Sequence, residues 1–348
     1  MSHNRLMEQL AIERPIIQAG MAGGITTPQL VSAVANEGAL GTIGAGYMDA
    51  STLKKQISKT KQRTNQSFAV NLFATDLQSH SNDVSEMQQF LNRYRQRLGI
   101  DNGKSSVTVH DDLQEKITVI LEENIPVVST AFGVLSAESI KRLKQNRVIL
   151  IGMATYLAEA EELIRAGYDI IVAQGSEAGG HRGTFSVDQH PNGCNIGLFA
   201  LIEQFVNHLS VPVIAAGGIH TGKQVKALLD MGASGVQIGT RFLVAKEAGT
   251  NNAYRQALLA AKSEDTVITK VFSGRPARAI HNRLIEEVET SDIPIQPFPL
   301  QNELTKDVRA AGKAQGVPDV QSLWAGQSVG AIKTEETVAE MIADLSTP

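Results

Sequence analysis

The sequence contains only one cysteine, Cys194, among 348 residues. A single cysteine can form neither an internal disulfide bond nor, without a second thiol, a zinc knuckle or a CxxC redox pair. No stretch approaches the about 18 consecutive apolar residues that indicate a membrane helix. The first residues, MSHNRLMEQLAIERP, carry scattered charges in place of the apolar core of a signal peptide. These absences predict an unexported, cytoplasmic protein without a membrane segment.

An excess of one charge sign is also missing. The 32 Lys and Arg residues against 36 Asp and Glu residues give a net charge of −4, without long runs of either sign. This balance predicts no basic surface for nucleic acid or anionic lipid, so neither is expected as a partner. The hydrophobic fraction of 42% is that of an ordinary globular protein, and the length allows two domains or one α/β barrel with additions.

What the chain does contain is a regular alternation of short β-branched runs and segments of helical length. Such alternation is typical of parallel strands that are buried on both faces and joined by crossover helices. We expect eight strands, at residues 15–19, 39–44, 68–73, 126–130, 148–152, 169–174, 211–216 and 235–239. Eight successive β/α units predict a closed (β/α)8 TIM barrel, because a doubly wound open sheet usually stops at about five to seven strands.

Two stretches depart from this eightfold rhythm. Residues 75–112 are polar with a helical segment in the middle, and residues 245–332 contain further helical pattern and a Pro-rich link. We therefore expect an α/β barrel over residues 1–244 with an insertion near 75–112. A smaller, mostly helical domain over residues 245–332 should cap the barrel mouth, and residues 333–348 should form a C-terminal helix that returns to the barrel.

Glycines follow the seventh and eighth expected strands, in AAGGIHTG and QIGTRF. At such turns the backbone N–H groups can approach a phosphate closely, and the N-terminus of the next helix adds its positive dipole end. Taken alone, Gly217 and Gly218 could equally serve only to turn the chain. Glycine-bearing turns on two adjacent strands favour a phosphate site.

His181 is the leading catalytic candidate. It follows the end of the sixth strand in a loop whose preceding glycines leave room for the side chain to face a ligand. An isolated loop histidine is more often solvated, but this one belongs to the same ring of strand ends as the phosphate site. Asn71 and Gln174 also stand at strand ends, where their amides suit the edge of a heteroaromatic ring or merely cap the strand.

Several other polar residues are left open by the sequence. Cys194 has no neighbouring base, which favours an idle thiol over a nucleophile. Arg182 could bind an anionic substrate or reach solvent, and Arg275 and Arg278 could contact an anion or a cofactor or form surface charge. The histidines have no metal-ligand spacing to one another or to carboxylates, so no metal is predicted.

Taken together, these residues resemble the nitronate monooxygenase family, the FMN-dependent enzymes formerly called 2-nitropropane dioxygenases. The resemblance spans most of the chain and rests on QAGMAGG (18–24), VNLF (70–73), AQGSEAGGHRGTF (173–185), AAGGI (215–219), QIGTRF (237–242), SGRPAR (273–278) and WAGQSVG (324–330). It implies a barrel with FMN at its mouth, a smaller substrate-side domain, and His181 as the catalytic histidine. The FMN contacts that it implies are Met21, Asn71, Gln174, Gly179, Gly180, Gly217, Gly218, Gln237, Ile238, Gly239 and Thr240.

The resemblance also implies a reaction. Members of the family oxidise alkyl nitronates such as propionate 3-nitronate with O2 to carbonyl compounds and nitrite or nitrate, through a flavin semiquinone. In that scheme we expect a protonated His181 to stabilise the anionic substrate or the semiquinone. A homodimer is possible, and the sequence does not decide the oligomeric state.

The chain departs from the family pattern at two places. Gly20 stands where many members have Pro, and residues 129–133 lack the His that some members carry at the end of the fourth strand. The resemblance therefore supports the predicted cofactor and chemistry more strongly than the predicted substrate.

Two other functions remain as alternatives. Flavin-type enoyl-ACP reductases share the barrel and a Gly-Gly-His loop but use NAD(P)H, although HRGTF after the glycines favours the nitronate branch. A barrel that binds a phosphorylated ligand without redox chemistry is the second alternative.

Overall fold

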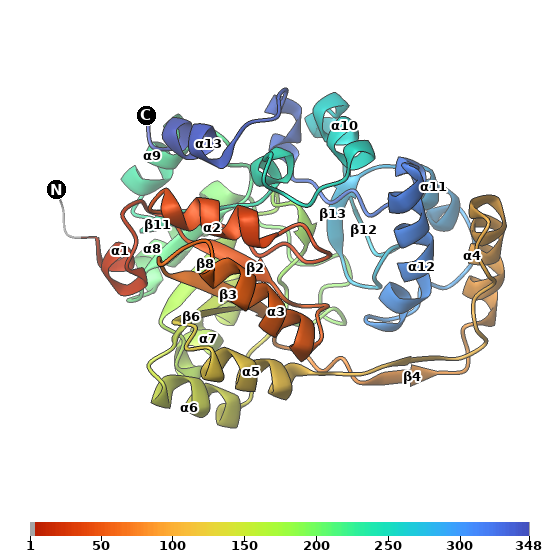
Figure 1. The fold of residues 1–348 in the computed structure, drawn as a ribbon, viewed down its shortest axis with the longest axis horizontal. Coiled ribbons are helices and arrows are strands. Elements are labelled where there is room, and N and C mark those ends of the chain that lie inside the picture. Colours follow the sequence, from red (N-terminus) through yellow and green to blue (C-terminus); the bar gives the residue numbers. More distant parts are fainter. Residues whose placement is uncertain (1–3, 348) are drawn as a thin grey trace.

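The computed structural model describes residues 4–347 and contains an eight-stranded parallel sheet that closes into a barrel (Figure 1). The strand order is β1-β11-β10-β8-β7-β6-β3-β2, and all neighbours run parallel. The strands are β1 (Ile16–Gln18), β2 (Gly41–Gly44), β3 (Phe68–Phe73), β6 (Val127–Ala131), β7 (Ile149–Ala154), β8 (Ile170–Gln174), β10 (Val213–Ala216) and β11 (Gly235–Ile238). Each matches one of the eight expected strands, with ends that differ by at most two residues.

The two outer strands of this order, β1 and β2, complete the ring. Ile17 forms a parallel bridge with Leu40, just before β2. The Gln18 N–H donates to the Leu40 carbonyl at 2.9 Å, and the Leu40 N–H donates to the Ile16 carbonyl at 3.0 Å. The predicted TIM barrel is therefore confirmed.

Helices surround the barrel, and side-chain caps set where several of them begin. They are α2 (Pro28–Asn36), α3 (Ala50–Lys61), α5 (Leu113–Glu122), α6 (Ala137–Gln145), α7 (Leu157–Ala166), α8 (Leu198–His208) and α9 (Gly222–Asp230). Thr27, Asp49, Ser136 and Thr221 each accept a hydrogen bond from a backbone N–H in the first turn of the helix that follows. No helix in residues 4–347 is long and apolar enough to cross a membrane.

The eighth helical position of the ring is filled from the far end of the chain. After β11 comes only a short 3-10 helix, η1 (Thr240–Val244), whereas α13 (Val338–Leu345) contacts both α9 and α2. A capping box at Thr337 and Glu340 begins α13, and its Val338, Met341, Ile342 and Leu345 are buried against the barrel. The C-terminal segment thus packs against α9, the helix that leads into β11 and its predicted glycine turn.

The strands alternate between two hydrophobic clusters, as buried parallel strands do. One residue of each pair, such as Ile16 or Val70, packs outward against the helices. The next, Ile17 or Ala69, packs inside the barrel, together with Leu6 from helix α1 (Arg5–Leu10). The barrel interior is therefore a packed core, and the space for a ligand lies at its rim.

A second hydrophobic core lies beside the barrel. It joins α4 (Ser85–Leu98) of the insertion to α11 (Arg283–Glu289), α12 (Leu300–Gln315) and the strands β12 (Thr266–Thr269) and β13 (Ala277–Ile280). The short ribbon of β4 (Ser79–Ser81) and β5 (Val107–Val109) carries α4 outward, and α4 lies along α12 (Figure 1). Buried Arg95 of α4 fixes this contact through Asp307, with 2.8 Å between Nε and Oδ2.

Parts of the chain after residue 244 belong to the hydrophobic cluster of the barrel. Helix α10 (Asn252–Ala260) and residues 323–345 contribute Tyr254, Leu258, Leu323 and Val329 to the large barrel cluster. The remaining short elements are η2 (Ser263–Asp265), η3 (Pro318–Val320) and η4 (Gln327–Ala331). The expected domain limits stay a prediction. The shared core shows that the insertion packs with the smaller helical part of the protein.

Candidate active site

The predicted site residues stand at one rim of the barrel because parallel strands bring their carboxyl ends together. Asn71 lies on β3, Gln174 ends β8, and Gln237 and Ile238 end β11. Met21 follows β1, Gly217 and Gly218 follow β10, and Gly239 and Thr240 follow β11. Gly179, Gly180 and His181 rise from the loop after β8, in which β9 (Gly180–His181) pairs with β13 of the smaller part.

The Gln174 amide holds the histidine loop. Its Nε2 donates to the His181 carbonyl at 3.0 Å, and its Oε1 accepts from the Gly183 N–H at 2.8 Å. Gly180, directly before His181, has a φ of +73°, a backbone conformation that favours glycine. The loop is therefore fixed to the end of β8, and the position of His181 follows from it.

The His181 ring lies among aromatic side chains from both parts of the protein. Its centroid is 5.2 Å from that of Trp324, 5.6 Å from Phe132 and 6.3 Å from Phe298. Its Nε2 is 2.8 Å from the Ser273 hydroxyl. These neighbours enclose the imidazole at the mouth of the barrel.

The surroundings of His181 disfavour the protonated form that the family reaction scheme led us to expect, and its protonation in the complex with FMN and substrate stays a prediction. Burial removes water from the imidazole and disfavours its charged form, and the positive charges of Arg275 and Arg309 act in the same direction. Together they lower the pKa of His181 to about 3. The imidazole is neutral at neutral pH, and the positive charge near it belongs to the two arginines.

The glycine turn after β10 has the shape of a cradle. Gly217 has a φ of +125° and Gly218 a φ of +71°, which side-chain-bearing residues rarely adopt. A Cβ at Gly217 would lie 3.1 Å from the Ala178 nitrogen. The backbone here can approach a ligand closely only because both residues are glycine.

A second close approach joins the histidine loop to the C-terminal region. A Cβ on Gly179 would lie 2.4 Å from the Gly326 nitrogen, so only glycine fits. The Gly326 N–H donates to the Thr240 hydroxyl at 3.0 Å, and the Gln327 N–H donates to the Glu177 carbonyl at 2.9 Å. The WAGQ stretch thus connects the loops that follow β8 and β11.

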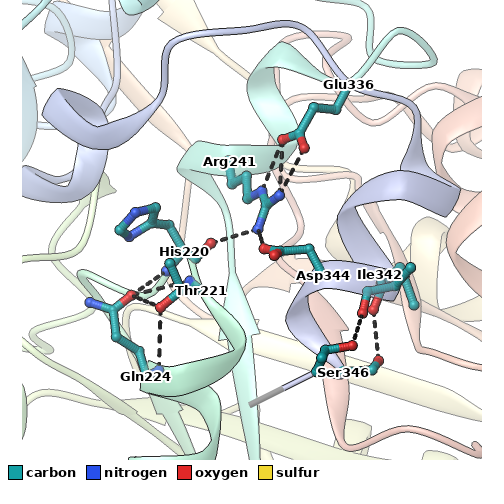
Figure 2. Close-up of polar contacts among 10 residues, drawn as sticks. His220, Thr221, Gln224, Arg241, Glu336, Ile342, Asp344 and Ser346 are labelled. Atoms are coloured by element: carbon teal, nitrogen blue, oxygen red, sulfur yellow. Dashed lines mark hydrogen bonds and ion pairs between the residues drawn. The ribbon is translucent and has the colours of Figure 1, made fainter.

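Arg241, directly after the β11 turn, is bound by acidic residues of the C-terminal segment (Figure 2). Its guanidinium is 3.0 Å from both Glu336 oxygens and 2.6 Å from Asp344, and it donates to the His220 carbonyl at 2.6 Å. Arg241 therefore neutralises carboxylates and fastens the C-terminal segment to the ends of β10 and β11.

Arg182 and Arg278 both hold loops. Arg182 is fully buried and donates to the carbonyls of Gly175, Gln174 and Cys194. Arg278 is buried too and donates to the Ser176 carbonyl and the Thr266 hydroxyl. Neither arginine reaches solvent, and the hydrogen bonds of both go to the protein itself.

The lack of a side chain at position 20 has a steric explanation in this structure. A Cβ at position 20 would lie 2.5 Å from the Asn71 Cβ and 3.2 Å from a Thr42 methyl group. Asn71 is itself held, because its Nδ2 donates to the Ser129 hydroxyl at 2.9 Å. Glycine at position 20, where many family members have Pro, therefore leaves the space that the Asn71 side chain occupies at the rim.

The rim has the features that a flavin mononucleotide needs. The Gly217–Gly218 turn offers backbone N–H groups for a phosphate, and the Nδ1 of the adjacent His220 is buried without a hydrogen-bond partner in residues 4–347. A Cβ on Gly23, Gly24 or Gly180 would meet no atom within 4 Å, so there is open space beside these loops. Amides of Asn71, Gln174 and Gln237 stand at the same rim, where an isoalloxazine edge could meet them.

Sequence reasoning missed the aromatic walls of the site. Phe132 follows β6, Phe298 lies in the Pro-rich link, and Trp324 follows η3, so their approach to His181 depends on tertiary packing. Ser273 belongs to SGRPAR, whose two arginines were considered as anion or cofactor contacts, and Trp324 belongs to WAGQSVG, which was noted only as part of the resemblance. Those two motifs were the available signal, whereas Phe298 had none.

Comparisons with known proteins agree with this geometry. A family model described as nitronate monooxygenase matches residues 4–347. A probable nitronate monooxygenase of Staphylococcus haemolyticus is 42% identical over 94% of this chain and 91% of its own, and one of Staphylococcus aureus is 44% identical over 93% and 91%. The solved structure of nitroalkane oxidase from Streptomyces ansochromogenes has a TM-score of 0.88 at 34% identity, covering 98% of this chain and 97% of its own. FabK from Thermotoga maritima has a TM-score of 0.76 at 28% identity, covering 99% and 95%.

A closed barrel with a glycine cradle and an enclosed histidine at its mouth defines an enzyme of the TIM-barrel class. The family match covers nearly the whole chain, and relatives above 40% identity identify the family within this class of enzymes. The chain belongs to the nitronate monooxygenase family and is a flavin-dependent oxidoreductase.

Proposed function

We propose that the protein is an FMN-dependent monooxygenase that oxidises alkyl nitronates such as propionate 3-nitronate with O2. The observation that carries the proposal is His181, enclosed by aromatic rings at the barrel mouth with two guanidinium groups close enough to lower its pKa. A small anion suits a site that is walled by apolar rings and positively charged.

The overall reaction balances with few components. The nitronate carbon gains one oxygen atom and becomes a carbonyl, the carbon–nitrogen bond breaks, and nitrogen leaves as nitrite, so that one O2 serves two nitronates. Where both oxygen atoms of O2 enter the products of one nitronate, nitrogen leaves as nitrate. FMN, when bound, supplies the one-electron chemistry that lets O2 take part.

The chain's own residues would bind and orient the cofactor and the substrate. The phosphate would be faced by Gly217, Gly218, Gly239 and Thr240. The residues that would face the flavin ring are Met21, Asn71, Gln174, Gly179, Gly180, Gln237 and Ile238. His181 is neutral, so its Nε2 can exchange a hydrogen bond between Ser273 and the substrate. The electrostatic attraction that a protonated histidine would have supplied comes instead from Arg275 and Arg309.

The protein loaded with FMN and mixed with propionate 3-nitronate tests this function. We expect O2 uptake and nitrite formation with the nitronate, and slow flavin reduction by NADH in a parallel sample. Rapid bleaching by NADH with reduction of an enoyl thioester would assign the enoyl-ACP reductase activity instead. A protein that stays colourless after incubation with FMN would leave only a ligand-binding barrel.

Replacing His181 tests the catalytic assignment separately. His181→Asn keeps a hydrogen-bonding side chain of smaller size, and we expect it to bind FMN while losing most nitronate oxidation. Full activity of the FMN-loaded variant would remove the role given to His181.

We also propose that the enzyme works in the cytoplasm. The support is a chain with one cysteine and no disulfide requirement. Cell fractionation with an antibody against the full chain would locate it. The homodimer stays a prediction that light scattering can test.

A further inference from the structure

The hydroxyl of Ser273 is the one hydrogen-bond partner that the His181 ring has within residues 4–347. The His181 Nε2 lies 2.8 Å from the Ser273 Oγ, whereas Nδ1 forms no hydrogen bond in that part of the chain. The lowered pKa of His181 leaves a single proton on the ring at neutral pH. In a neutral imidazole one nitrogen carries the proton and the other accepts, and the hydrogen-bond partners determine which is which. The direction of this single hydrogen bond therefore decides the tautomer of His181.

The Ser273 hydroxyl has one proton and two neighbours that could accept it, the Arg275 carbonyl and the His181 Nε2. Its Oγ lies 3.2 Å from the Arg275 carbonyl oxygen and accepts from the Arg275 N–H at 3.3 Å. Within the described chain the Arg275 carbonyl has no other donor, and Arg275 and Ser273 are both buried. Because a buried carbonyl without a hydrogen bond is costly, the hydroxyl proton belongs on that carbonyl. The remaining lone pair of the Ser273 oxygen then accepts a proton from Nε2.

The turn that carries Ser273 is held in place by the backbone around it. The Ser273 N–H donates to the Lys270 carbonyl at 3.2 Å, and the Gly274 N–H donates to the same oxygen at 2.7 Å. Gly274 has a φ of +82°, and a Cβ there would lie 2.6 Å from the Phe298 nitrogen, so the Pro-rich link packs directly on this turn. The Ser273 oxygen therefore stays at one place, and the imidazole of His181 is oriented toward it.

We propose that Ser273 is a positioning residue that keeps the proton of the neutral His181 ring on Nε2. With the proton there, Nε2 is a hydrogen-bond donor, and an oxygen of an anionic nitronate can take over this bond from Ser273. The opposite tautomer would present a lone pair at the same atom, which repels an anion. This catalytic consequence rests on the proposed function, whereas the tautomer itself does not.

The tautomer can be measured by 15N NMR of the protein labelled at its histidines, with and without FMN. Protonated and unprotonated ring nitrogens have well-separated chemical shifts, and the signals of His181 are those that are absent from His181→Asn. At pH 7 we expect a protonated Nε2 and an unprotonated Nδ1 for His181. A proton on Nδ1, alone or together with one on Nε2, would overturn the proposal.

The variant Ser273→Ala removes the acceptor and leaves both ring nitrogens without a partner in the described chain. We expect a signal from protonated Nδ1 to appear beside that from protonated Nε2. The kcat for propionate 3-nitronate should fall by about tenfold, because the ring loses both its donor state and its fixed orientation, while FMN affinity stays unchanged. Ser273→Thr keeps the hydroxyl and should restore the wild-type tautomer and most of kcat. A wild-type tautomer in Ser273→Ala would overturn the proposal.

Thr269→Val is the matched control for the loss of a buried hydroxyl in this segment. The Thr269 oxygen accepts from the Val271 N–H at 3.2 Å, as Ser273 does from Arg275, and its hydroxyl donates to Glu289 at 2.6 Å. Thr269→Val should lower stability but keep the tautomer of His181 and kcat. An equal loss of kcat in both variants would mean that the segment serves only the fold, and would overturn the positioning role. If the wild type oxidises no nitronate, the proposed function fails, and the 15N signals still decide whether Ser273 sets the tautomer.

Discussion

The side-chain amide of Gln174 donates to the main-chain carbonyl of His181, with 3.0 Å between Nε2 and the oxygen. Its other end accepts from the Gly183 N–H at 2.8 Å. Gln174 thus clamps the loop on both sides of Arg182, and the last residue of a barrel strand fixes the backbone of the candidate catalytic histidine. An amide at this place can do so because it is donor and acceptor at once.

We predict that Gln174→Glu lowers kcat for nitronate oxidation by about tenfold or more. The carboxylate can still accept from Gly183, but it loses the donor to His181 and places negative charge against a carbonyl oxygen, an unfavourable contact of a few kcal/mol when buried. Steady-state assays with saturated FMN would measure the loss. Gln204→Glu on the exposed face of α8 is the control and should leave kcat unchanged.

The low pKa of His181 predicts an acid-dependent loss of stability. The folded protein holds His181 neutral down to a pKa of about 3, whereas the unfolded chain takes up a proton near the ordinary histidine pKa of 6.5. Between these values the unfolded state binds more protons, so the free energy of unfolding falls as pH decreases below about 6.5. From pH 7 to pH 5 this contribution is about 1 to 2 kcal/mol.

Urea unfolding of wild type and His181→Asn at both pH values would measure that contribution. The wild type should lose more stability than the variant over this interval, because Asn has no proton to bind. Equal losses in the two proteins would show that His181 titrates near its ordinary pKa in the folded state.

The barrel could be predicted from the sequence because its signals are local. Each strand is a short apolar run, and residues such as Thr27 and Asp49 cap the next helix within a few residues of the strand end. The phosphate-side glycines were visible for the same reason, since Gly217 and Gly218 need their conformation for the turn itself. Such features depend on neighbours in sequence.

The walls of the site could not be predicted, because they depend on contacts between distant segments. Nothing near Phe298 or Arg309 in the sequence indicates that the first packs near the His181 ring or that the charge of the second lowers the pKa of His181. The insertion was predicted, but its packing on α12 through Arg95 and Asp307 joins residues more than 200 positions apart. The desolvation and the two arginines that lower the pKa of His181 become visible only in the folded site.

The ion pair between Arg241 and Glu336 leads to a prediction about the C-terminal segment. Glu336→Gln removes one charge from the bidentate pair with Arg241, and we expect a stability loss of about 1 to 3 kcal/mol, since hydrogen bonds to charged groups contribute this much. FMN affinity should fall by at least about threefold, because η1 begins at Thr240, the residue before Arg241. Thermal unfolding and an FMN titration would measure both. Asp230→Asn, in the exposed pair with Lys226, should change stability by less than about 0.5 kcal/mol.

Gly20 gives a prediction about the departure from the family pattern. Gly20→Ala should destabilise the protein by about 1 to 3 kcal/mol, because the new Cβ would stand 2.5 Å from that of Asn71 and one of the two must move. The same displacement should weaken FMN binding if Asn71 faces the cofactor. Chemical unfolding of both single variants and of the double variant with Asn71→Gly would locate the cause. The penalty of Gly20→Ala should shrink in the Asn71→Gly background, where the colliding Cβ is gone, and an unchanged penalty would place the strain elsewhere in the β1 turn.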